Sequence, residues 1–327
     1  MPIIDSKYVE RPWYFPSGHF ETVVPSLFYE VKGVQFDRER LELPDGDFLD
    51  LDWVRRNEKR VVVITHGLEG SSDRHYVLRQ VLVFQEKGWD VLAWNNRSCS
   101  GDLNRLPKFY HHGATEDLSA VIDHAFAQGY EEMVLIGFSM GGGMQQKYLG
   151  EREPDLRIRG AISFSVPCNV LDSADMLSKK GNRFYERKFI KKLKHKILEK
   201  AKILELPVNL EEIKKVQTFR DLDNAFTIKV YPEYHDAEDF YQKITSDQFL
   251  PNIKIPLLIV NAQNDPMLGK KCYPIELAKQ MDNLYLEMPE LGGHVGFTIS
   301  ADKSYMEVAA AWFVDNVIYQ NGNISSS

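Results

Sequence analysis

The segment that most constrains the fold of this chain is Met133–Gly143, which reads MVLIGFSMGGG. Its leading apolar residues predict a buried strand, and the residues after Gly141 predict a helix. A G-x-S-x-G pattern between a strand and a helix is typical of a nucleophile elbow, in which the serine lies on a strained turn. Gly137 and Gly141 would let strand and helix close together without side-chain collisions. We therefore expect the Ser139 hydroxyl to project from the C-terminal edge of a sheet.

Other glycine motifs fit this segment less well. A P-loop needs Lys-Ser/Thr after its last glycine, and Gly142 is not followed by that pair. The spacing of a dinucleotide-binding fingerprint is also missing. The structural alternative is a glycine-rich turn that only begins a helix, so the rest of the chain has to supply the context.

The composition fits a globular protein with a substantial core. The 327 residues are 43% hydrophobic and 27% charged, and they could form one large α/β domain or two small ones. The net charge of −7 argues against a nucleic-acid partner. Cys99, Cys168 and Cys272 form no C-x-x-C pair, and neither a signal peptide nor a membrane-spanning apolar run is visible. We expect a cytoplasmic protein.

The first part of the chain predicts an arm and a hairpin. Residues 1–30 are rich in aromatics and prolines, so we expect an irregular arm packed on the domain. A strand over residues 34–43, a Pro-Asp-Gly turn and a second strand predict an antiparallel hairpin at a sheet edge. In the second strand Asp50 and Asp52 alternate with apolar residues, which predicts one solvated face.

No metal ion or other cofactor is expected. The acids that include Asp45 and Asp47 resemble a calcium loop only superficially, because the glycine and the final Glu are misplaced. The chain also has no H-E-x-x-H motif and no Cys/His cluster.

From Arg60 onward, strand-like and helix-like segments alternate, which predicts a doubly wound, mostly parallel sheet. The expected strands are residues 61–64, 89–94, 133–136, 160–164, 255–260 and 284–288, and the clearest helices are 115–128, 141–150 and 304–317. The fold class is therefore α/β, with an N-terminal antiparallel edge and an inserted helical cap. We expect an arm at 1–30, a discontinuous core at 31–166 and 251–320, a cap at 167–250 and a polar tail at 321–327.

The predicted cap is helical and charged. Its Lys179–Lys202 stretch holds eleven Lys or Arg residues, which favours a lid helix with a solvated basic face. The alternative is a surface attracted weakly to anionic lipid or to acidic substrate groups. Aromatic residues of the cap are candidates to line an acyl pocket; they are Phe184, Tyr185, Phe189, Phe226, Tyr231, Phe240 and Tyr241.

A serine nucleophile needs a base, and the base needs an orienting acid. In an α/β-hydrolase arrangement the order along the chain is Ser, Asp or Glu, then His. His294 is the histidine that follows the predicted strand ending near Asp265, and that acid lies at a strand C-terminus, where sites of open α/β sheets gather. Asp282 belongs to the opposite edge. The residues predict a triad of Ser139, Asp265 and His294.

The oxyanion formed during acyl transfer needs two fixed N–H donors. One should be Met140, directly after the nucleophile, and the other Leu68, in the loop after the 61–64 strand. We expect His66 to shape that loop rather than to react.

Several motifs together resemble one family, and the resemblance covers nearly the whole chain. They are HGLEGSS at 66–72, NNRSCSG at 95–101, GFSMGG at 137–142, NDP at 264–266 and GH at 293–294. The chain resembles the YheT-like (EMB8-type) branch of the serine α/β-hydrolases. The resemblance implies the same triad and an esterase or alcohol acyltransferase acting on acyl esters, with lipid substrates in eukaryotic relatives. Ser98 stands where glycine is usual, and we expect no membrane anchor like that of those relatives.

The leading hypothesis is a serine carboxylic-ester hydrolase that forms an acyl-enzyme on Ser139, on short- to medium-chain esters. An alcohol O-acyltransferase with the same triad is the alternative, since only the competition between water and acceptor differs. A non-catalytic binding protein of the same fold is a third hypothesis. The sequence leaves the oligomeric state open.

Overall fold

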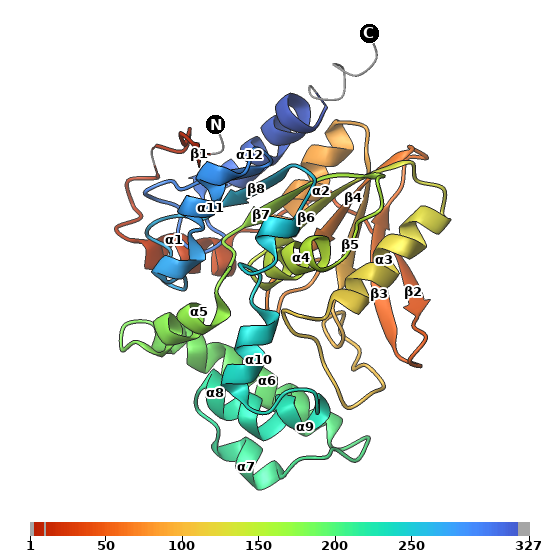
Figure 1. The fold of residues 1–327 in the computed structure, drawn as a ribbon, viewed down its shortest axis with the longest axis vertical. Coiled ribbons are helices and arrows are strands. Elements are labelled where there is room, and N and C mark those ends of the chain that lie inside the picture. The colour runs from red at the N-terminus through yellow and green to blue at the C-terminus, as the bar shows by residue number, and fades with distance from the viewer. Residues whose placement is uncertain (1–2, 10, 320–327) are drawn as a thin grey trace.

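A nine-stranded sheet runs through the molecule in the order β1-β9-β8-β7-β6-β4-β5-β3-β2 (Figure 1). The computed structural model describes residues 3–9 and 11–319. Neighbours from β1 to β5 in that order are parallel, whereas β3 pairs antiparallel with both β5 and β2. The strands are β1 (Ile3–Ile4), β2 (Asp37–Glu42), β3 (Phe48–Val54), β4 (Arg60–Thr65), β5 (Asp90–Asn95), β6 (Glu132–Phe138), β7 (Ile158–Phe164), β8 (Leu257–Val260) and β9 (Leu284–Glu287). The predicted fold class is confirmed.

Helices cover both faces of the sheet, which explains its continuous apolar strands. In β4, Val61 and Val63 pack with α3 and α4, while Val62 and Ile64 pack with α2 and α12. One face carries α3 (Thr115–Ala127), α4 (Met140–Glu151) and α11 (Ile275–Gln280); the other carries α2 (His75–Glu86) and α12 (Tyr305–Phe313). The short strands β10 (Thr298–Ser300) and β11 (Lys303–Ser304) precede α12. A π-helical turn, η4 (Val314–Ile318), extends α12 at its C-terminal end. The predicted tail at 321–327 lies outside the described residues.

The expectation of an irregular N-terminal arm is wrong in two places. Residues Ile3–Ile4 form β1, which joins the central sheet beside β9, and Gly18–Phe28 form the helix α1. Pro25 suggested a break, yet it lies inside α1. Pro25 cannot donate to the carbonyl of Glu21, and that carbonyl packs instead against Gly296, so closely that an added Cβ there would lie 2.1 Å away. Tertiary contact therefore overrides the local signal.

The expected solvated face of the hairpin is also wrong. Asp50 and Asp52 of β3 are 2% and 0% exposed. Each lies directly opposite an arginine of β2, and Arg40 and Arg38 bind them in bidentate ion pairs of 2.7–2.8 Å. The alternating polar pattern marks a row of cross-strand ion pairs, because the long arginine side chains of the neighbouring strand β2 cover the aspartates on this face.

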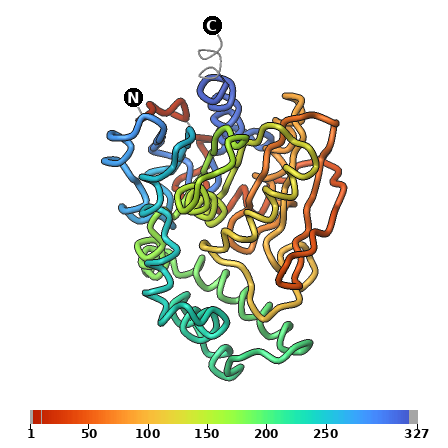
Figure 2. Tube along the Cα trace, turned by 45° about the vertical axis from the view of Figure 1, so that its right-hand side comes forward, coloured from red at the N-terminus to blue at the C-terminus, as the bar shows by residue number. Residues whose placement is uncertain are grey.

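A helical cap lies between β7 and β8 in the sequence and below the sheet in the views of Figures 1 and 2. It contains α5 (Val170–Ser178), α6 (Arg183–Lys200), α7 (Leu210–Lys215), α8 (Phe219–Leu222), the π-helical η1 (Asp223–Thr227), α9 (Ile228–Val230) and α10 (Ala237–Ile244). None of the helices in residues 3–9 and 11–319 is long and apolar enough to span a bilayer.

Candidate active site

The turn between β6 and α4 has the geometry that a nucleophile elbow requires. Ser139 has φ 51° and ψ −120°, a left-handed conformation that is strained for a residue with a side chain. A Cβ on Gly137 would lie 2.6 Å from the Cα of Gly142, and one on Gly141 would lie 2.4 Å from the carbonyl oxygen of Thr65. Side chains at these two positions would therefore force strand and helix apart.

Ser139, His294 and Asp265 form one continuous chain of hydrogen bonds. The Ser139 Oγ lies 2.9 Å from His294 Nε2, and His294 Nδ1 lies 2.8 Å from Asp265 Oδ2. Because a carboxylate only accepts, Nδ1 carries the proton, which leaves Nε2 free to accept from the serine hydroxyl. The orientation suits proton transfer from serine to imidazole.

Asp265 is held by its own backbone surroundings. It is 4% exposed, and its second oxygen accepts a hydrogen bond of 2.8 Å from the Met267 N–H. Asp282, the alternative acid, is exposed and precedes β9, so it lies at the opposite edge of the sheet. The structure therefore brings Asp265 to the histidine and leaves Asp282 away from it.

The loop that carries His294 is fixed by α1, a connection that sequence reasoning missed. The backbone N–H of His294 donates to Thr22 Oγ1 at 2.8 Å. The N–H of Gly292 donates to Glu21 Oε1 at 3.0 Å, and Glu21 is fully buried. Asn264, next to the acid, donates to the other oxygen of Glu21 at 2.6 Å and accepts from the Gly293 N–H. Two residues of the N-terminal helix thus hold the histidine loop and the residue before Asp265.

Two backbone N–H groups near Ser139 are free to bind an oxyanion. Among the described residues, neither the N–H of Met140 nor that of Leu68 donates a hydrogen bond. The loop that carries Leu68 approaches the nucleophile closely, since a Cβ on Gly67 would lie 3.2 Å from that of Ser139.

His66 holds this loop from within. The buried imidazole donates from Nδ1 to the Gly67 carbonyl at 2.7 Å and accepts at Nε2 from the Asn96 N–H at 3.1 Å. Burial lowers the pKa of His66 to about 4, so the ring stays neutral and keeps both contacts.

The NNRSCSG motif contributes a buried ion-pair cluster rather than a reacting group. Arg97 is 5% exposed and pairs with Asp45, Asp47 and Asp117 at 2.9, 2.8 and 2.7 Å. These contacts raise the pKa of the guanidinium despite its burial, Asp117 foremost. The cluster joins the hairpin turn, the loop after β5 and the first turn of α3, which fixes the loop beside His66.

A cavity lies directly over Ser139, between the sheet edge and the cap. Its empty volume is about 1100 Å³, part of it open to solvent, and Ser139, Met140, Leu68 and His294 line its floor. Its walls are mainly apolar, as is usual for sites that bind small molecules. Most of the cap aromatics named from sequence line it; they are Phe189, Phe226, Tyr231, Phe240 and Tyr241.

Two of the proposed cap aromatics do not line the cavity. Phe184 is 47% exposed, and the Tyr185 hydroxyl lies 3.1 Å from His19 Nδ1 of α1. They belong to the start of α6, where the cap meets the N-terminal helix. The sequence shows that they are aromatic, but only the packing of α6 decides which way they face.

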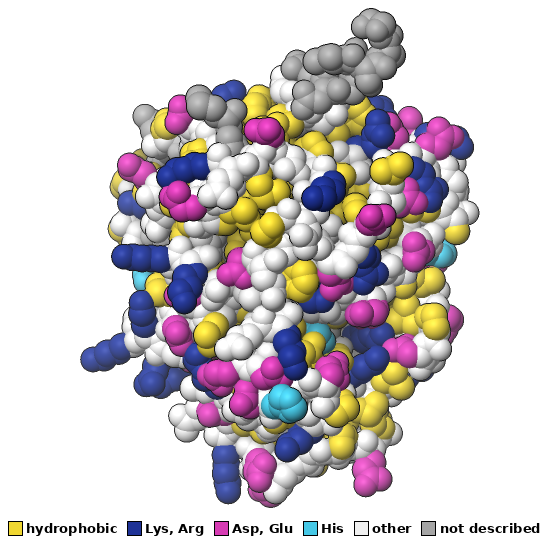
Figure 3. Space-filling model, in the orientation of Figure 1, with side chains coloured by type: hydrophobic (Ala, Val, Ile, Leu, Met, Phe, Trp, Pro, Cys, Tyr) yellow, Lys and Arg dark blue, Asp and Glu magenta, His cyan; other side chains and the backbone are white. Residues whose placement is uncertain are grey.

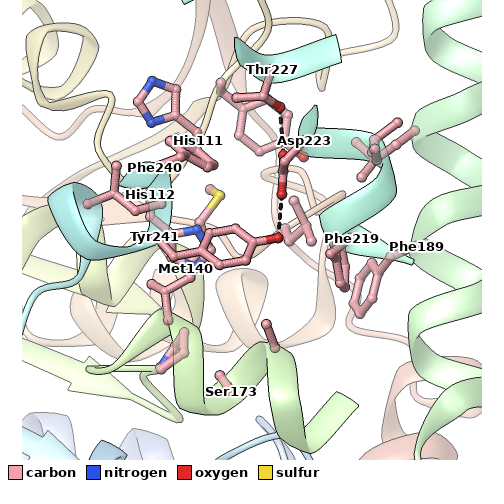
Figure 4. Close-up of a pocket in the computed structure, with 18 of the residues that line it drawn as sticks. His111, His112, Met140, Ser173, Phe189, Phe219, Asp223, Thr227, Phe240 and Tyr241 are labelled. Carbon is pink, nitrogen blue, oxygen red and sulfur yellow. Dashed lines mark hydrogen bonds between the residues drawn. The ribbon is translucent and has the colours of Figure 1, made fainter. Parts of the chain in front are cut away.

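The cavity also holds polar side chains that sequence reasoning missed. His111 and His112 line it, and burial lowers their pKa values to about 3 and about 4, so both rings are neutral. Asp223 of η1 also faces the cavity (Figure 4). A His-His pair and a lone Asp in a charged helical stretch carry no recognisable motif, so no local signal separates them from surface residues.

Comparison with known proteins agrees with this architecture. Residues 56–275 match the family described as serine aminopeptidase, S33 (Hydrolase_4). YheT of Escherichia coli is 34% identical over 86% of this chain and 85% of its own length. Phospholipase ABHD3 of Bos taurus is 26% identical over 99% of this chain and 82% of its own.

A solved structure shares the fold. The esterase Pf2001 of Pyrococcus furiosus superposes with a TM-score of 0.57 at 15% identity, covering 88% of this chain and 95% of that one. At this low sequence identity, the structural similarity supports the assignment of the fold alone. The sequence matches carry the family assignment, and the chain belongs to the YheT-like branch of the serine α/β-hydrolase superfamily.

Proposed function

We propose that this protein is a serine carboxylic-ester hydrolase (EC 3.1.1) that forms an acyl-enzyme on Ser139. One observation carries the proposal: the unbroken hydrogen-bond chain from Ser139 through His294 to Asp265 opens onto an apolar cavity. The names of relatives support the same class, since ABHD3 is named a phospholipase.

In the proposed reaction, His294 Nε2 takes the proton of Ser139 as the Oγ attacks the ester carbonyl. Asp265 stabilises the imidazolium that results. The imidazolium then returns the proton to the departing alcohol, which leaves the acyl group on Ser139. A water molecule, deprotonated by His294, attacks the acyl-enzyme, releases the acid and restores the serine.

The N–H groups of Leu68 and Met140 are the proposed oxyanion donors. Both are free among the described residues, and both border the same cavity as Ser139. One such donor contributes about a hundred- to a thousandfold to the rate of acyl transfer. The N–H of Ser139 itself is not available as an oxyanion donor, because it already donates to the Phe164 carbonyl at 2.8 Å.

The proposed substrates are short- to medium-chain acyl esters, with the acyl chain lying against the cap. Transfer to an alcohol instead of water uses the same groups, so product analysis has to separate the two. The panel consists of p-nitrophenyl esters of increasing chain length, each assayed with and without a short alcohol. Free acid as the main product supports the hydrolase, whereas a new ester at the expense of acid supports the acyltransferase.

The decisive test of Ser139 is its reaction with a fluorophosphonate probe. We expect the purified protein to be labelled at one site and Ser139→Ala to be unlabelled and inactive on esters, since loss of a nucleophile costs about a millionfold in kcat. Ser246→Ala is the matched control, because that buried serine lies outside the cavity lining. Labelling of Ser139→Ala, or ester turnover near the wild-type rate, would contradict the proposal.

We also propose that the start of α6 contacts anionic lipid surfaces. Lys and Arg side chains gather at the left of Figure 3, around the connection between α5 and α6. Lys179, Lys180, Arg183, Arg187 and Lys188 are exposed there and form no ion pair with another described residue. Unpaired basic side chains of this kind are attracted to negatively charged headgroups.

Exposed aromatic side chains lie on the neighbouring helix α1 and in the turn before it. His19 of α1 contacts Phe184 and Tyr185 of α6, so the two segments adjoin. Trp13 is 92% exposed and Phe28 is 71% exposed. Exposed aromatic rings are favourable at a membrane interface.

Sedimentation with vesicles tests this contact. We expect binding to phosphatidylserine-containing vesicles that weakens with added salt and falls in Arg183→Glu. Lys254→Glu, an equal charge change at another exposed position, should bind like the wild type. Equal binding to neutral vesicles, or equal loss in both variants, would contradict an electrostatic contact.

We also propose that the protein is located in a reducing, cytoplasmic compartment. Cys99, Cys168 and Cys272 are free thiols. Burial raises the pKa of Cys99 to about 11 and that of Cys272 to about 12, so neither is a reactive thiolate at neutral pH.

A further inference from the structure

One charged side chain faces the cavity without a countercharge. Asp223, the first residue of η1, accepts hydrogen bonds of 2.6 Å from Thr227 Oγ1 and from the Tyr241 hydroxyl (Figure 4). Each bond occupies one lone-pair site on one oxygen, whereas an ionised carboxylate offers about four such sites. The remaining sites are available to a bound molecule, because Asp223 belongs to the cavity lining.

No cation within the described residues neutralises this carboxylate. Asp223 takes part in no salt bridge there, and the side chains that line the cavity include no Lys or Arg. Arg220, one turn earlier, is already paired with Asp175 at 2.7 Å and with Glu238 at 2.6 Å. His111 and His112 of the cavity supply no charge either, since burial lowers the pKa of each and keeps both rings neutral at physiological pH.

The surroundings of Asp223 favour a cation over a neutral donor. The rings of Phe226, Phe240 and Tyr241 line the same cavity, and the faces of aromatic rings attract positive charge. Burial raises the pKa of Asp223 to about 6, while the bonds from Thr227 and Tyr241 oppose that rise. The carboxylate is therefore still largely ionised at pH 8, in an environment where a bare anion is costly.

A purely structural role explains less of this arrangement. The Tyr241 bond joins η1 to α10, and such a tie would hold the cap together. An amide could make a similar tie, however, by accepting from one hydroxyl and donating to the oxygen of the other, without the cost of placing a charge in the cavity. Placing a carboxylate in a mainly apolar cavity is understandable if a substrate brings the opposite charge.

We propose that Asp223, with the aromatic rings around it, forms a subsite that binds a positively charged group of the alkylammonium class carried by the ester substrate. This subsite rests on the proposed ester hydrolysis and specifies one class of substrate for it. Asp223 belongs to the cap and Ser139 to the turn between β6 and α4, so the positive group and the ester bond are separate parts of the substrate.

Two pairs of matched esters test the subsite. In the first pair, p-nitrophenyl esters carry acyl chains of equal length that end either in trimethylammonium or in its neutral tert-butyl isostere. In the second pair, the same two groups lie at the end of the alcohol portion, with butyrate as the acyl group. The comparison is the ratio of kcat/KM between the charged and the neutral ester of a pair, at pH 8.

We expect the wild type to prefer the charged ester about tenfold in one of the two pairs. Asp223→Asn should reduce that ratio to about one, because the amide carries no charge to attract the ammonium group. Glu233→Gln, which removes an equal charge from an exposed position of the cap, should leave the ratio unchanged. Thermal unfolding of each variant reports whether the cap is intact.

The outcomes that overturn the subsite differ from those that overturn the esterase. A wild type that prefers the neutral ester in both pairs overturns the subsite without any variant. An equal ratio in the wild type and in folded Asp223→Asn does the same. If neither member of a pair is hydrolysed in a Ser139-dependent way, the proposed ester hydrolysis itself fails.

Discussion

At the scale of single residues, the site depends on a few side chains held in one protonation and rotamer state. His294 has one orienting acceptor, Asp265, and one reacting partner, Ser139. The carboxylate fixes the tautomer, and the strained serine backbone fixes the direction of the hydroxyl. The geometry suits the predicted triad, and the catalytic roles of its three members stay predictions until they are measured.

The role of Asp265 can be separated from that of Asp282. We expect Asp265→Asn to lower kcat about ten-thousandfold, because an amide at this place favours the wrong imidazole tautomer. Asp282→Asn, at an exposed position on the opposite edge, should change kcat less than twofold. Steady-state kinetics on one p-nitrophenyl ester decides between them, and a larger loss in Asp282→Asn would reassign the acid.

At the scale of secondary-structure elements, two helical segments act on the site from outside the sheet. The N-terminal helix α1 holds the histidine loop through Glu21 and Thr22. The cap covers the cavity and supplies most of its aromatic wall. One element therefore positions the reacting groups, and the other shapes the space for the substrate.

Thr22 is predicted to be a positioning residue. Thr22→Val keeps the shape of the side chain but leaves the His294 N–H without its acceptor, and we expect kcat to fall about tenfold with KM little changed. Ser17→Ala is the control, because the Ser17 side chain makes no capping bond to α1. Equal effects of both variants, or a change confined to KM, would show that α1 does not position the base.

The cap is predicted to determine which acyl chain lengths the enzyme prefers. Each additional buried methylene contributes about 0.8 kcal/mol, so kcat/KM should rise several-fold per two-carbon step from acetyl until the cavity is filled. Replacing residues 167–250 by a short linker should flatten this preference while Ser139 still reacts with a small fluorophosphonate. An acetyl optimum in the intact protein would show that the cap does not select the chain, as would an unchanged preference without it.

At the scale of the whole molecule, two lysines of α6 attach the cap to the core. Lys196 pairs with Glu69 at 2.6 Å, directly beside the proposed oxyanion donor Leu68. Lys200 is fully buried and donates to Asn104 and, at 2.6 Å, to the carbonyl of Leu106. Part of the basic segment is therefore an internal contact rather than a solvated face.

The burial of Lys200 predicts a pH dependence of stability. Burial lowers its pKa to about 7, below its ordinary value of 10.5, so between these values the unfolded chain binds a proton that the folded chain does not. In that window stability should rise with pH, by at most about 1.4 kcal/mol per pH unit from this group. Denaturant unfolding at pH 7 and pH 9 measures the effect.

The contribution of Lys200 is isolated by comparison with Lys200→Met, which removes the titrating group. The stability difference between wild type and variant should shift in favour of the wild type as the pH rises from 7 to 9. A difference that is constant across this range would show that Lys200 stays charged in the folded protein. Lys202→Met, at an exposed position two residues later, should show no such shift.

The sequence by itself determined the sheet and the reacting residues as a hypothesis. The runs at 61–64 and 133–136 predict buried parallel strands because burial on both faces leaves a continuous apolar pattern. The elbow is readable because a strained turn between strand and helix demands glycines at fixed spacing, as at Gly137 and Gly141. Order along the chain then singled out Asp265 and His294.

Only the tertiary structure decided how that site is supported and what it can bind. Thr22 and His294 are 272 residues apart, and no local periodicity encodes their contact. The sequence predicts that Asp52 faces solvent and that Asp223 is one more surface charge. In the structure Arg38 covers Asp52, and the fold of the cap directs Asp223 toward the cavity. The local sequence pattern predicts which faces of a helix or strand are buried. It does not predict which distant residue a side chain will contact, because that contact depends on how the elements pack together.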